Sequence, residues 1–414
     1  MQPLVAIRES AQTASLTGIH SRFIEAIMII SRNHYWKLLV GSVLASILLT
    51  SILTGSAQTN DNHVNDTKVI ARAILSQPMT IGWRYDSNLT VNLTPAFDAE
   101  RLYLPLAGGT VVSLKADNGQ LNWRSEMGGE LSASPVADDR GVYVASETGK
   151  PGSGTRRATG ALRLLGREGG VTQWMRTLET PLRGSLVLVN GTLFAGGSDG
   201  KVYAFDSTSG ALRWFYDYGE PFTGYPMVSG GRVYIGSEDG NLLVLDQATG
   251  KLQWHYRTKG PLRGALAIGH DAVYFGSGDG YVYAANATSG RAIWHKRTGA
   301  GVQAVVRVGD ELLVASLDNF VYKFSLAGAR LWKRQLPGRI SSQPLMTTTE
   351  ALFMPLSSSA GVVLGLRDGR PVNSLPVGQE ITSSASPIAV GDVVLLTTQQ
   401  GLIAFTGPRE APPN

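Results

Sequence analysis

The side chains that most often carry out catalysis are scarce in this sequence, and those present stand at repeated positions. The chain has no cysteine, which excludes thiolate nucleophiles, disulfides and cysteine-bound metal centres. His255 and His295 each follow a tryptophan directly, and no two histidines have metal-ligand spacing. Residues 196–200 match the G-x-S-x-G pattern of hydrolases, but they read as a hairpin turn, whereas a nucleophile needs a strand-to-helix turn. The sequence therefore predicts that the protein is not an enzyme and uses no cofactor or metal.

Basic residues in loops are the remaining candidates, and they predict binding of another protein that offers an acidic or β-edge surface. Pro-Leu-Arg-Gly occurs twice, at 181–184 and 261–264, and an insertion at 148–160 carries two arginines at its tip. Further basic residues gather in or near successive loops from Arg257 to Arg339, and nearby hairpins offer only Asp279 and Asp318 in return. Arginine can pair bidentately with carboxylates of a partner. Two alternatives stay open: the basic loop residues could form an ordinary solvated rim, and the 148–160 insertion could be a surface loop without a function. The candidate partner-binding residues are Arg183, Arg263, Leu182, Leu262, Arg156, Arg157, Lys259, Arg297 and Arg339.

A tryptophan repeat indicates which elements position these loops. Most steps between the seven repeated tryptophans are 40 residues, with exceptions of 51 and 38. A period near 40 with strand-like content is typical of stacked copies of one small sheet. The repeated residues are Trp83, Trp123, Trp174, Trp214, Trp254, Trp294 and Trp332.

Each repeat reads as a four-stranded antiparallel meander. Residues 222–257 hold four short runs rich in Val, Ile, Leu and Tyr, separated by turns that contain glycine. One turn is Ser-x-Asp-Gly and the other is Asp/Asn-x-x-Ser/Thr-Gly, as at 246–250. Each tryptophan comes four residues after the second turn's glycine, so we expect its ring on the outer strand, packed against the neighbouring sheet.

The count of repeats predicts an all-β fold, an eight-bladed β-propeller of four-stranded antiparallel blades over residues 78–407. The seventh repeat has Asn373 where a tryptophan is expected, and the last repeat supplies only three strands. A strand around Trp83, at the front of the chain, would complete the last blade and leave no open sheet edge. Residues 408–414 are predicted to be a loose tail.

The front of the chain predicts export. Residues 38–58 carry no charge and follow Arg32 and Lys37, so residues 1–57 read as a cytoplasmic segment plus a signal peptide cleaved after Ala57. The same stretch is long enough to remain as a membrane anchor, and that alternative stays open. Residues 58–77 read as a polar linker. We expect a periplasmic or cell-envelope location, with membrane contact only through an uncleaved leader, and the net charge of +5 is too small to predict nucleic-acid binding.

The repeat resembles the pyrroloquinoline-quinone (PQQ) type propeller repeat, whose signature is A-x-D-x-x-T-G-x-x-x-W, over about four fifths of the chain. Members of that superfamily that are dehydrogenases stack the quinone on a tryptophan and bind calcium with inward acidic and amide side chains. Here every repeated tryptophan already has a structural position, and no such cluster stands out. A quinone-dependent dehydrogenase is therefore the least favoured alternative.

Within that superfamily the chain is most similar to the BamB outer-membrane assembly factors. That resemblance implies a scaffold for β-barrel assembly that binds the periplasmic domains of BamA through a Leu-Arg-Gly loop. Two departures weaken it: Ser56 stands where a lipidated cysteine would be, and the loop before the fourth blade has Phe222-Thr223-Gly224 in place of Leu-Arg-Gly. A generic envelope sensor or binding module stays open as an alternative function.

Overall fold

The computed structural model describes residues 74–148, 158–378, 380 and 382–407, and within these ranges the protein consists of β-strands joined by turns and loops. The described residues include no helix, and hence none that could span a bilayer. The predicted leader, most of the predicted linker, the tip of the insertion and the tail lie outside the described residues.

Five sheets are four-stranded antiparallel meanders whose strands follow chain order. The first contains β2 (Ala96–Phe97), β3 (Arg101–Leu106), β4 (Thr110–Lys115) and β5 (Leu121–Glu126). The next two contain β14 (Met227–Ser229), β15 (Arg232–Gly236), β16 (Asn241–Asp246) and β17 (Leu252–Arg257), then β18 (Ala267–Ile268), β19 (Ala272–Gly276), β20 (Tyr281–Asn286) and β21 (Ala292–Arg297). The last two contain β22 (Val302–Val308), β23 (Glu311–Ser316), β24 (Phe320–Ser325) and β25 (Arg330–Gln335), then β26 (Leu345–Met346), β27 (Glu350–Phe353), β28 (Ala360–Gly365) and β29 (Pro371–Pro376).

An eight-stranded sheet contains two further meanders of the same kind. A single parallel bridge between Ser134 and Ser185 joins their innermost strands, β6 and β10. The first meander contains β6 (Leu131–Asp138), β7 (Gly141–Thr148), β8 (Thr159–Gly166) and β9 (Thr172–Leu178). The second contains β10 (Leu182–Val189), β11 (Thr192–Gly197), β12 (Lys201–Asp206) and β13 (Leu212–Asp217).

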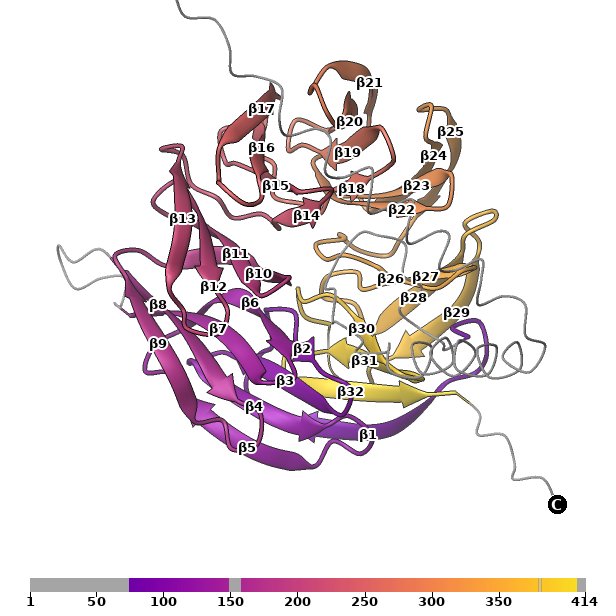
Figure 1. Ribbon diagram of the computed structural model, residues 1–414. Helices are drawn as coiled ribbons and strands as arrows, with labels where there is room; N and C mark the ends of the chain where they lie inside the picture. Colours follow the sequence, from indigo (N-terminus) through magenta and orange to yellow (C-terminus); the bar gives the residue numbers. More distant parts are fainter. Residues whose placement is uncertain (1–73, 149–157, 379, 381, 408–414) are drawn as a thin grey trace, which may run out of the picture. The chain divides into compact units, whose positions relative to one another are not determined.

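The remaining sheet joins the two ends of the described chain. β1 (Thr80–Asp86) pairs antiparallel with β32 (Gly401–Thr406), which pairs with β31 (Val393–Thr397) and then β30 (Ile388–Val390). Trp83 of β1 lies opposite Ala404. In Figure 1 the sheets follow one another in chain order, and β1 lies beside β32.

The burial of each strand follows its place in its sheet. The inner strands are buried on both faces, as in β4, whereas the outermost strand alternates and is largely exposed, as in β13. Both faces are buried because neighbouring sheets share cores: one cluster contains Val112 of β4 and Leu395 of β31. This explains the runs of consecutive Val, Leu, Ile and Tyr in the sequence, which a sheet with one solvated face would not need.

The repeated tryptophans lie between neighbouring sheets, as the sequence predicts. Gly290 has a φ of +68°, and a Cβ atom there would lie 2.6 Å from the Trp254 ring. The indole Nε1 of Trp254 donates to the carbonyl oxygen of Ala287 at 3.1 Å. Each tryptophan contacts the turn glycine of the next sheet in the pairs Trp83–Gly119, Trp123–Gly170, Trp174–Gly210, Trp214–Gly250, Trp254–Gly290, Trp294–Gly328 and Trp332–Gly369.

Asn373 takes the tryptophan's place in β29, where it pairs with Val363 just as Trp254 pairs with Val244. The next sheet has no hairpin for an indole to cover, because its outer strand is β1 and the chain segment before β1 lies there instead. Asn373 Nδ2 donates to the carbonyl oxygens of Leu75 at 2.7 Å and Gln77 at 2.8 Å. A short polar side chain thus holds the incoming segment. Leu75, inside the predicted linker range 58–77, is fully buried.

Candidate protein-binding face

The loops that connect successive sheets lie against the β-hairpins of the following sheet. The backbone N–H of Lys259 donates to Asp279 Oδ2 at 3.0 Å, and that of Gly299 donates to Asp318 Oδ2 at 2.8 Å. In the next pair of sheets, the carbonyl oxygen of Arg339 accepts from the N–H of Leu356 at 2.7 Å. We call this surface the loop face. It comprises connecting loops 258–266, 298–301 and 336–344 with Arg297 at the end of β21, hairpins 277–280, 317–319 and 354–359, and the corresponding segments 179–184, 221–226 and 237–240.

The two leucines of the repeated Leu-Arg-Gly motif do not lie on the surface. Leu182 is 1% exposed and Leu262 is 4% exposed, each within a shared core. They belong to the alternating pattern that continues into the inner strand, so their side chains point between sheets. This removes Leu182 and Leu262 from the candidate partner-binding residues, because a partner could reach them only after local unfolding.

The glycine of the first motif allows close packing of neighbouring loops. Gly184 has a φ of +73°, and a Cβ atom there would lie 1.9 Å from the carbonyl oxygen of Gly224. Any other residue would strain the backbone and collide with the next loop. The motif therefore has a structural explanation in this chain, which the sequence alone did not separate from partner recognition.

The two arginines of the motif form ion pairs within the protein. Arg183 Nη2 lies 2.6 Å from Glu147 Oε2. Arg263 donates to both oxygens of Glu238, from Nε at 2.8 Å and from Nη2 at 2.5 Å. The prediction that only Asp279 and Asp318 oppose the cations from Arg257 to Arg339 is therefore wrong, because Glu238 pairs with Arg263.

A sequence signal for these pairs existed. Glu147 and Glu238 each follow a serine in the hairpin of the sheet that precedes an Arg-containing loop. The intervening sheet has Ser198 in that hairpin, and the loop after it has Thr223 in place of arginine. The joint occurrence of glutamate in one hairpin and arginine in the following loop could have predicted the pairing.

The bidentate contact between Arg263 and Glu238 shifts the pKa values of both side chains. The hydrogen bonds from Arg263 hold the pKa of Glu238 below its ordinary value, although partial burial opposes them. Glu238 reciprocally raises the pKa of Arg263. Because the Arg263 side chain is 56% exposed, solvent screens the pair and its net contribution to stability is small.

Three other predicted residues remain available to a partner. Lys259, Arg297 and Arg339 are exposed, and none has an ion-pair partner among the residues that the structure describes. They occupy three consecutive connections, directly after β17, at the end of β21 and after β25. Arg156 and Arg157 lie outside the described residues.

The hairpin aspartates between these cations are held by uncharged donors. Asp279 accepts from Tyr283 Oη at 2.7 Å and from the backbone of Lys259, and Asp318 accepts from Tyr322 Oη and the backbone of Gly299. Burial, together with the hydrogen bond to Asp318, raises the pKa of Tyr322 to about 12. Asp279 and Asp318 thus fix the loops and leave the basic side chains unpaired.

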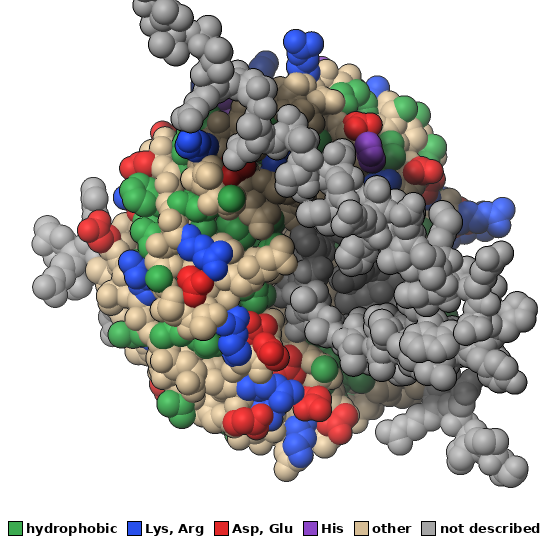
Figure 2. All heavy atoms as spheres, viewed as in Figure 1, with side chains coloured by type: hydrophobic (Ala, Val, Ile, Leu, Met, Phe, Trp, Pro, Cys, Tyr) green, Lys and Arg blue, Asp and Glu red, His purple; other side chains and the backbone are tan. Residues whose placement is uncertain are grey.

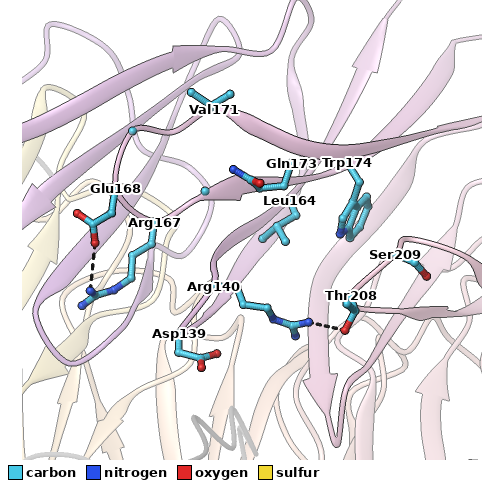
Figure 3. A pocket seen from close by; sticks show the side chains of 12 residues that line it. Asp139, Arg140, Leu164, Arg167, Glu168, Val171, Gln173, Trp174, Thr208 and Ser209 are labelled. Atoms are coloured by element: carbon cyan, nitrogen blue, oxygen red, sulfur yellow. Dashed lines mark hydrogen bonds and ion pairs between the residues drawn. The ribbon is translucent and has the colours of Figure 1, made fainter.

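A groove of 760 Å³ lies elsewhere, between the β6–β9 and β10–β13 meanders, and its basic residues are engaged (Figure 3). Arg140 reaches across it to Thr208 Oγ1 at 2.6 Å and also donates to Asp138. Arg167 forms an ion pair with Asp98 at 2.9 Å. Figure 2 likewise shows basic and acidic side chains next to one another over β2–β5. Neither arginine of this groove is therefore a free cation for a ligand.

The inner strands and the loops before them meet through hydroxyl and backbone groups. Ser134 Oγ accepts from the N–H of Thr94 at 3.1 Å, and Thr94 Oγ1 accepts from the N–H of Ser386 at 3.2 Å. Within the described ranges, no three His, Asp or Glu residues gather as metal ligands would. His255 and His295 lie on outer strands, as predicted, and are exposed.

Comparison with solved structures shows that the fold is a β-propeller. BamB from Moraxella catarrhalis matches with a TM-score of 0.65 at 17% identity, over 81% of this chain and 100% of that one. The computationally designed Ika8 protein matches with a TM-score of 0.68 at 15% identity, over 79% of this chain and 99% of that one. Quinohemoprotein alcohol dehydrogenase from Comamonas testosteroni matches with a TM-score of 0.65 at 12% identity, over 86% of this chain and 79% of that one.

Sequence comparison is more specific than these structural matches. A search of curated proteins found no significant match. The family model described as outer membrane protein assembly factor BamB matches residues 73–157, 158–267 and 258–411. Because these segments cover most of the chain, the protein belongs to the PQQ-repeat family of outer membrane protein assembly factor BamB.

Proposed function

We propose that the chain forms a closed, eight-bladed propeller that acts as a non-catalytic, protein-binding scaffold in the cell envelope, with a BamB-like role in the assembly of outer-membrane β-barrels. Closure is supported by contacts between the first and last parts of the described chain. β1 completes the sheet of β30–β32, Ser386 donates to Thr94 at 3.2 Å, and Ser384 Oγ donates to the carbonyl oxygen of Asn92 at 3.3 Å.

The observation that carries the scaffold proposal is the position of the tryptophans. Each of the seven in the described chain lies against a glycine of the adjoining sheet, and six also donate Nε1–H to a carbonyl oxygen. No described indole is therefore free to stack on a ligand. A rigid scaffold whose loops differ between sheets is well suited to present a binding surface.

The specific role rests on the family. Family membership supports a location in the cell envelope and a part in outer-membrane assembly, and we propose the periplasmic domains of BamA as the partner. Arg183 and Arg263 each form an ion pair with a glutamate of this chain. This supports a partner contact that does not depend on the arginine of a Leu-Arg-Gly loop. In this proposal the partner meets the loop face, whose Lys259, Arg297 and Arg339 are unpaired among the described residues.

Deletion of the gene in the organism that carries it tests this role. We expect lower amounts of folded outer-membrane β-barrel proteins, measured as the heat-modifiable fraction on gels, and restoration by the full chain supplied in trans. Unchanged amounts of folded barrel proteins in the deletion strain would contradict the proposed role.

One alternative has an observation in its favour, the structural similarity to a quinohemoprotein alcohol dehydrogenase, but at 12% identity that similarity concerns the fold alone. Addition of PQQ and Ca²⁺ to the purified chain distinguishes the two functions. The scaffold proposal predicts no new absorbance band and no dye-linked alcohol oxidation, and the appearance of both would favour the enzyme.

A further inference from the structure

We infer that Lys259, Arg297 and Arg339 form a docking strip on the loop face for an extended protein segment with spaced carboxylates. This inference deepens the proposed function and rests on it. It assigns the contact to three consecutive connections between sheets and specifies the chemistry of the partner.

The three cations lie in or beside successive connections, five, three and seven residues after Trp254, Trp294 and Trp332 respectively. Lys259 follows β17 and its backbone binds Asp279 in the next sheet, whereas Arg297 pairs with Tyr281 at the other side of the same hairpin. Arg339 follows β25, and its carbonyl oxygen binds the 354–359 hairpin. Cationic side chains therefore recur along the loop face from one connection to the next. Arg257, the last residue of β17, is also exposed.

Internal pairing distinguishes this strip from the other loop cations. Arg183 and Arg263 already have Glu147 and Glu238 as partners at hydrogen-bonding distance. A partner's carboxylate would have to displace those glutamates before it could bind either arginine. No such competition exists at Lys259, Arg297 and Arg339, for which the described part of the chain supplies no ion pair. Basic side chains left unpaired on a rigid surface attract and orient an oppositely charged partner.

The hairpin aspartates restrict the kind of anion that fits. Asp279 accepts from the backbone of Lys259 and stands two residues before Tyr281, which pairs with Arg297; Asp318 accepts from the backbone of Gly299 in the next connection. A continuous polyanion, such as nucleic acid or an anionic membrane surface, would meet these carboxylates as well as the cations. A protein segment can instead place its carboxylates opposite the cations and neutral or donor groups opposite the aspartates. Carboxylates in the hairpins next to these cations therefore favour a protein partner.

A binding assay with a matched control tests the strip directly. The probe is a short fluorescent peptide that alternates Glu with Gly and Ser, and binding to the full chain in detergent micelles is measured by fluorescence anisotropy. The strip variant carries Lys259→Gln, Arg297→Gln and Arg339→Gln. The control variant carries Lys251→Gln, Arg291→Gln and Arg330→Gln, which change the same net charge near the opposite ends of β17, β21 and β25 and are also exposed.

We expect the strip variant to bind the peptide about tenfold more weakly than the unsubstituted chain, and the control variant to bind within about twofold of it. Binding should also weaken as salt is raised from about 0.05 M to about 0.3 M, because salt screens exposed charges. No measurable binding, or equal losses in the two variants, would overturn the strip. Tighter binding of a single-stranded oligonucleotide or of phosphatidylglycerol vesicles, lost in the strip variant, would overturn the choice of a protein partner.

Complementation of the deletion strain separates this inference from the proposed function. If the unsubstituted chain and the control variant restore folded barrel proteins and the strip variant does not, the strip and the function both stand. If all three restore them equally, the strip fails and the function stands. If the deletion itself has no effect on barrel proteins, the proposed function fails, and peptide binding is then the sole test of the strip.

Discussion

Asn373 Nδ2 donates a hydrogen bond to the carbonyl oxygen of Leu75, across 298 residues of sequence, at 2.7 Å. Around this contact Leu75 is fully buried and its N–H donates to Glu350 Oε2 at 2.8 Å. The segment before β1 is therefore held by side chains of the β26–β29 sheet. This explains why the repeat lacks a tryptophan here: an indole needs a hairpin glycine to cover, and the neighbouring sheet has the segment before β1 at that place instead.

Replacement of Asn373 should loosen the start of the described chain. Asn373→Ala leaves two carbonyl oxygens without their donor, which we expect to cost about 1–3 kcal/mol of unfolding free energy. Hydrogen exchange of the β1 amides should accelerate at the same time. Val372→Ala, at the exposed neighbouring position, is the control and should change neither quantity. Unchanged β1 exchange in Asn373→Ala would show that this contact does not secure β1.

Because the tryptophans pack against turn glycines of the next sheet, replacement of such a glycine should strongly lower the free energy of unfolding. Gly290→Ala adds a Cβ atom 2.6 Å from the Trp254 ring at a φ of +68°. Gly231→Ala is the matched control, because Gly231 has a φ of +74° and open space around its Cβ position. Backbone strain alone should cost about 1–2 kcal/mol in each variant. Chemical denaturation should show a clearly larger loss in Gly290→Ala; equal losses would argue against close packing by the indole.

The Asp98 carboxylate predicts a loss of stability in acid. Burial alone would raise its pKa, but hydrogen bonds from Arg167, the backbone of Glu100 and Tyr103 outweigh burial and lower the pKa below its ordinary value. A lowered pKa stabilises the fold above the unfolded carboxyl pKa of about 3.9, and this contribution is lost as pH falls through the lower folded value.

We therefore expect Asp98→Asn to cost about 2 kcal/mol at neutral pH and progressively less below about pH 4. Thermal unfolding as a function of pH measures the difference. Asp310→Asn is the control, since that side chain is 97% exposed and its nearest cation is 3.9 Å away. A difference between Asp98→Asn and the unsubstituted chain that stays constant down to about pH 2 would contradict the linkage.

A double-mutant cycle on Arg263 and Glu238 measures how strongly the Leu-Arg-Gly loop is held. Because Arg263 is 56% exposed, we expect a coupling free energy below about 1 kcal/mol despite the bidentate geometry. The single and double alanine variants supply the four unfolding free energies that the cycle needs. A coupling above about 2 kcal/mol would mean that the pair is an essential clamp between the two sheets.

The repeated parts of the fold were predictable from the sequence because each repeat contains the same turn motif and the same spacing to its tryptophan. The Asp-x-x-Ser/Thr-Gly turn is formed as at Asp206, whose Oδ1 accepts from the N–H groups of Thr208 and Ser209 before Gly210. The tryptophan four residues later then falls on the outer strand. These contacts are short-range or recur at a fixed spacing, so one sequence is enough to find them.

Contacts that break the repeat were not predictable in the same way. Nothing near Asn373 in sequence indicates that its partner is Leu75, because that contact arises only when the two parts of the chain meet. The burial of Leu182 depends on a neighbouring sheet. The ion pair between Arg263 and Glu238 differs from these two cases, because glutamate in one hairpin and arginine in the following loop occur together in the sequence. The prediction of a binding site from basic residues did not use that signal and therefore included cations that are already paired.

The most direct test of the account is photo-crosslinking in living cells from position 297, with position 291 as the control. Arg291 directly precedes β21 and Arg297 ends it. Both side chains are exposed, so a photoreactive residue at either position should leave the fold intact. We expect a crosslinked product that contains BamA from position 297 and none from position 291. Equal products from both positions, or no BamA product from position 297 in cells that contain normal amounts of the protein, would contradict the claim that the loop face binds the assembly machinery.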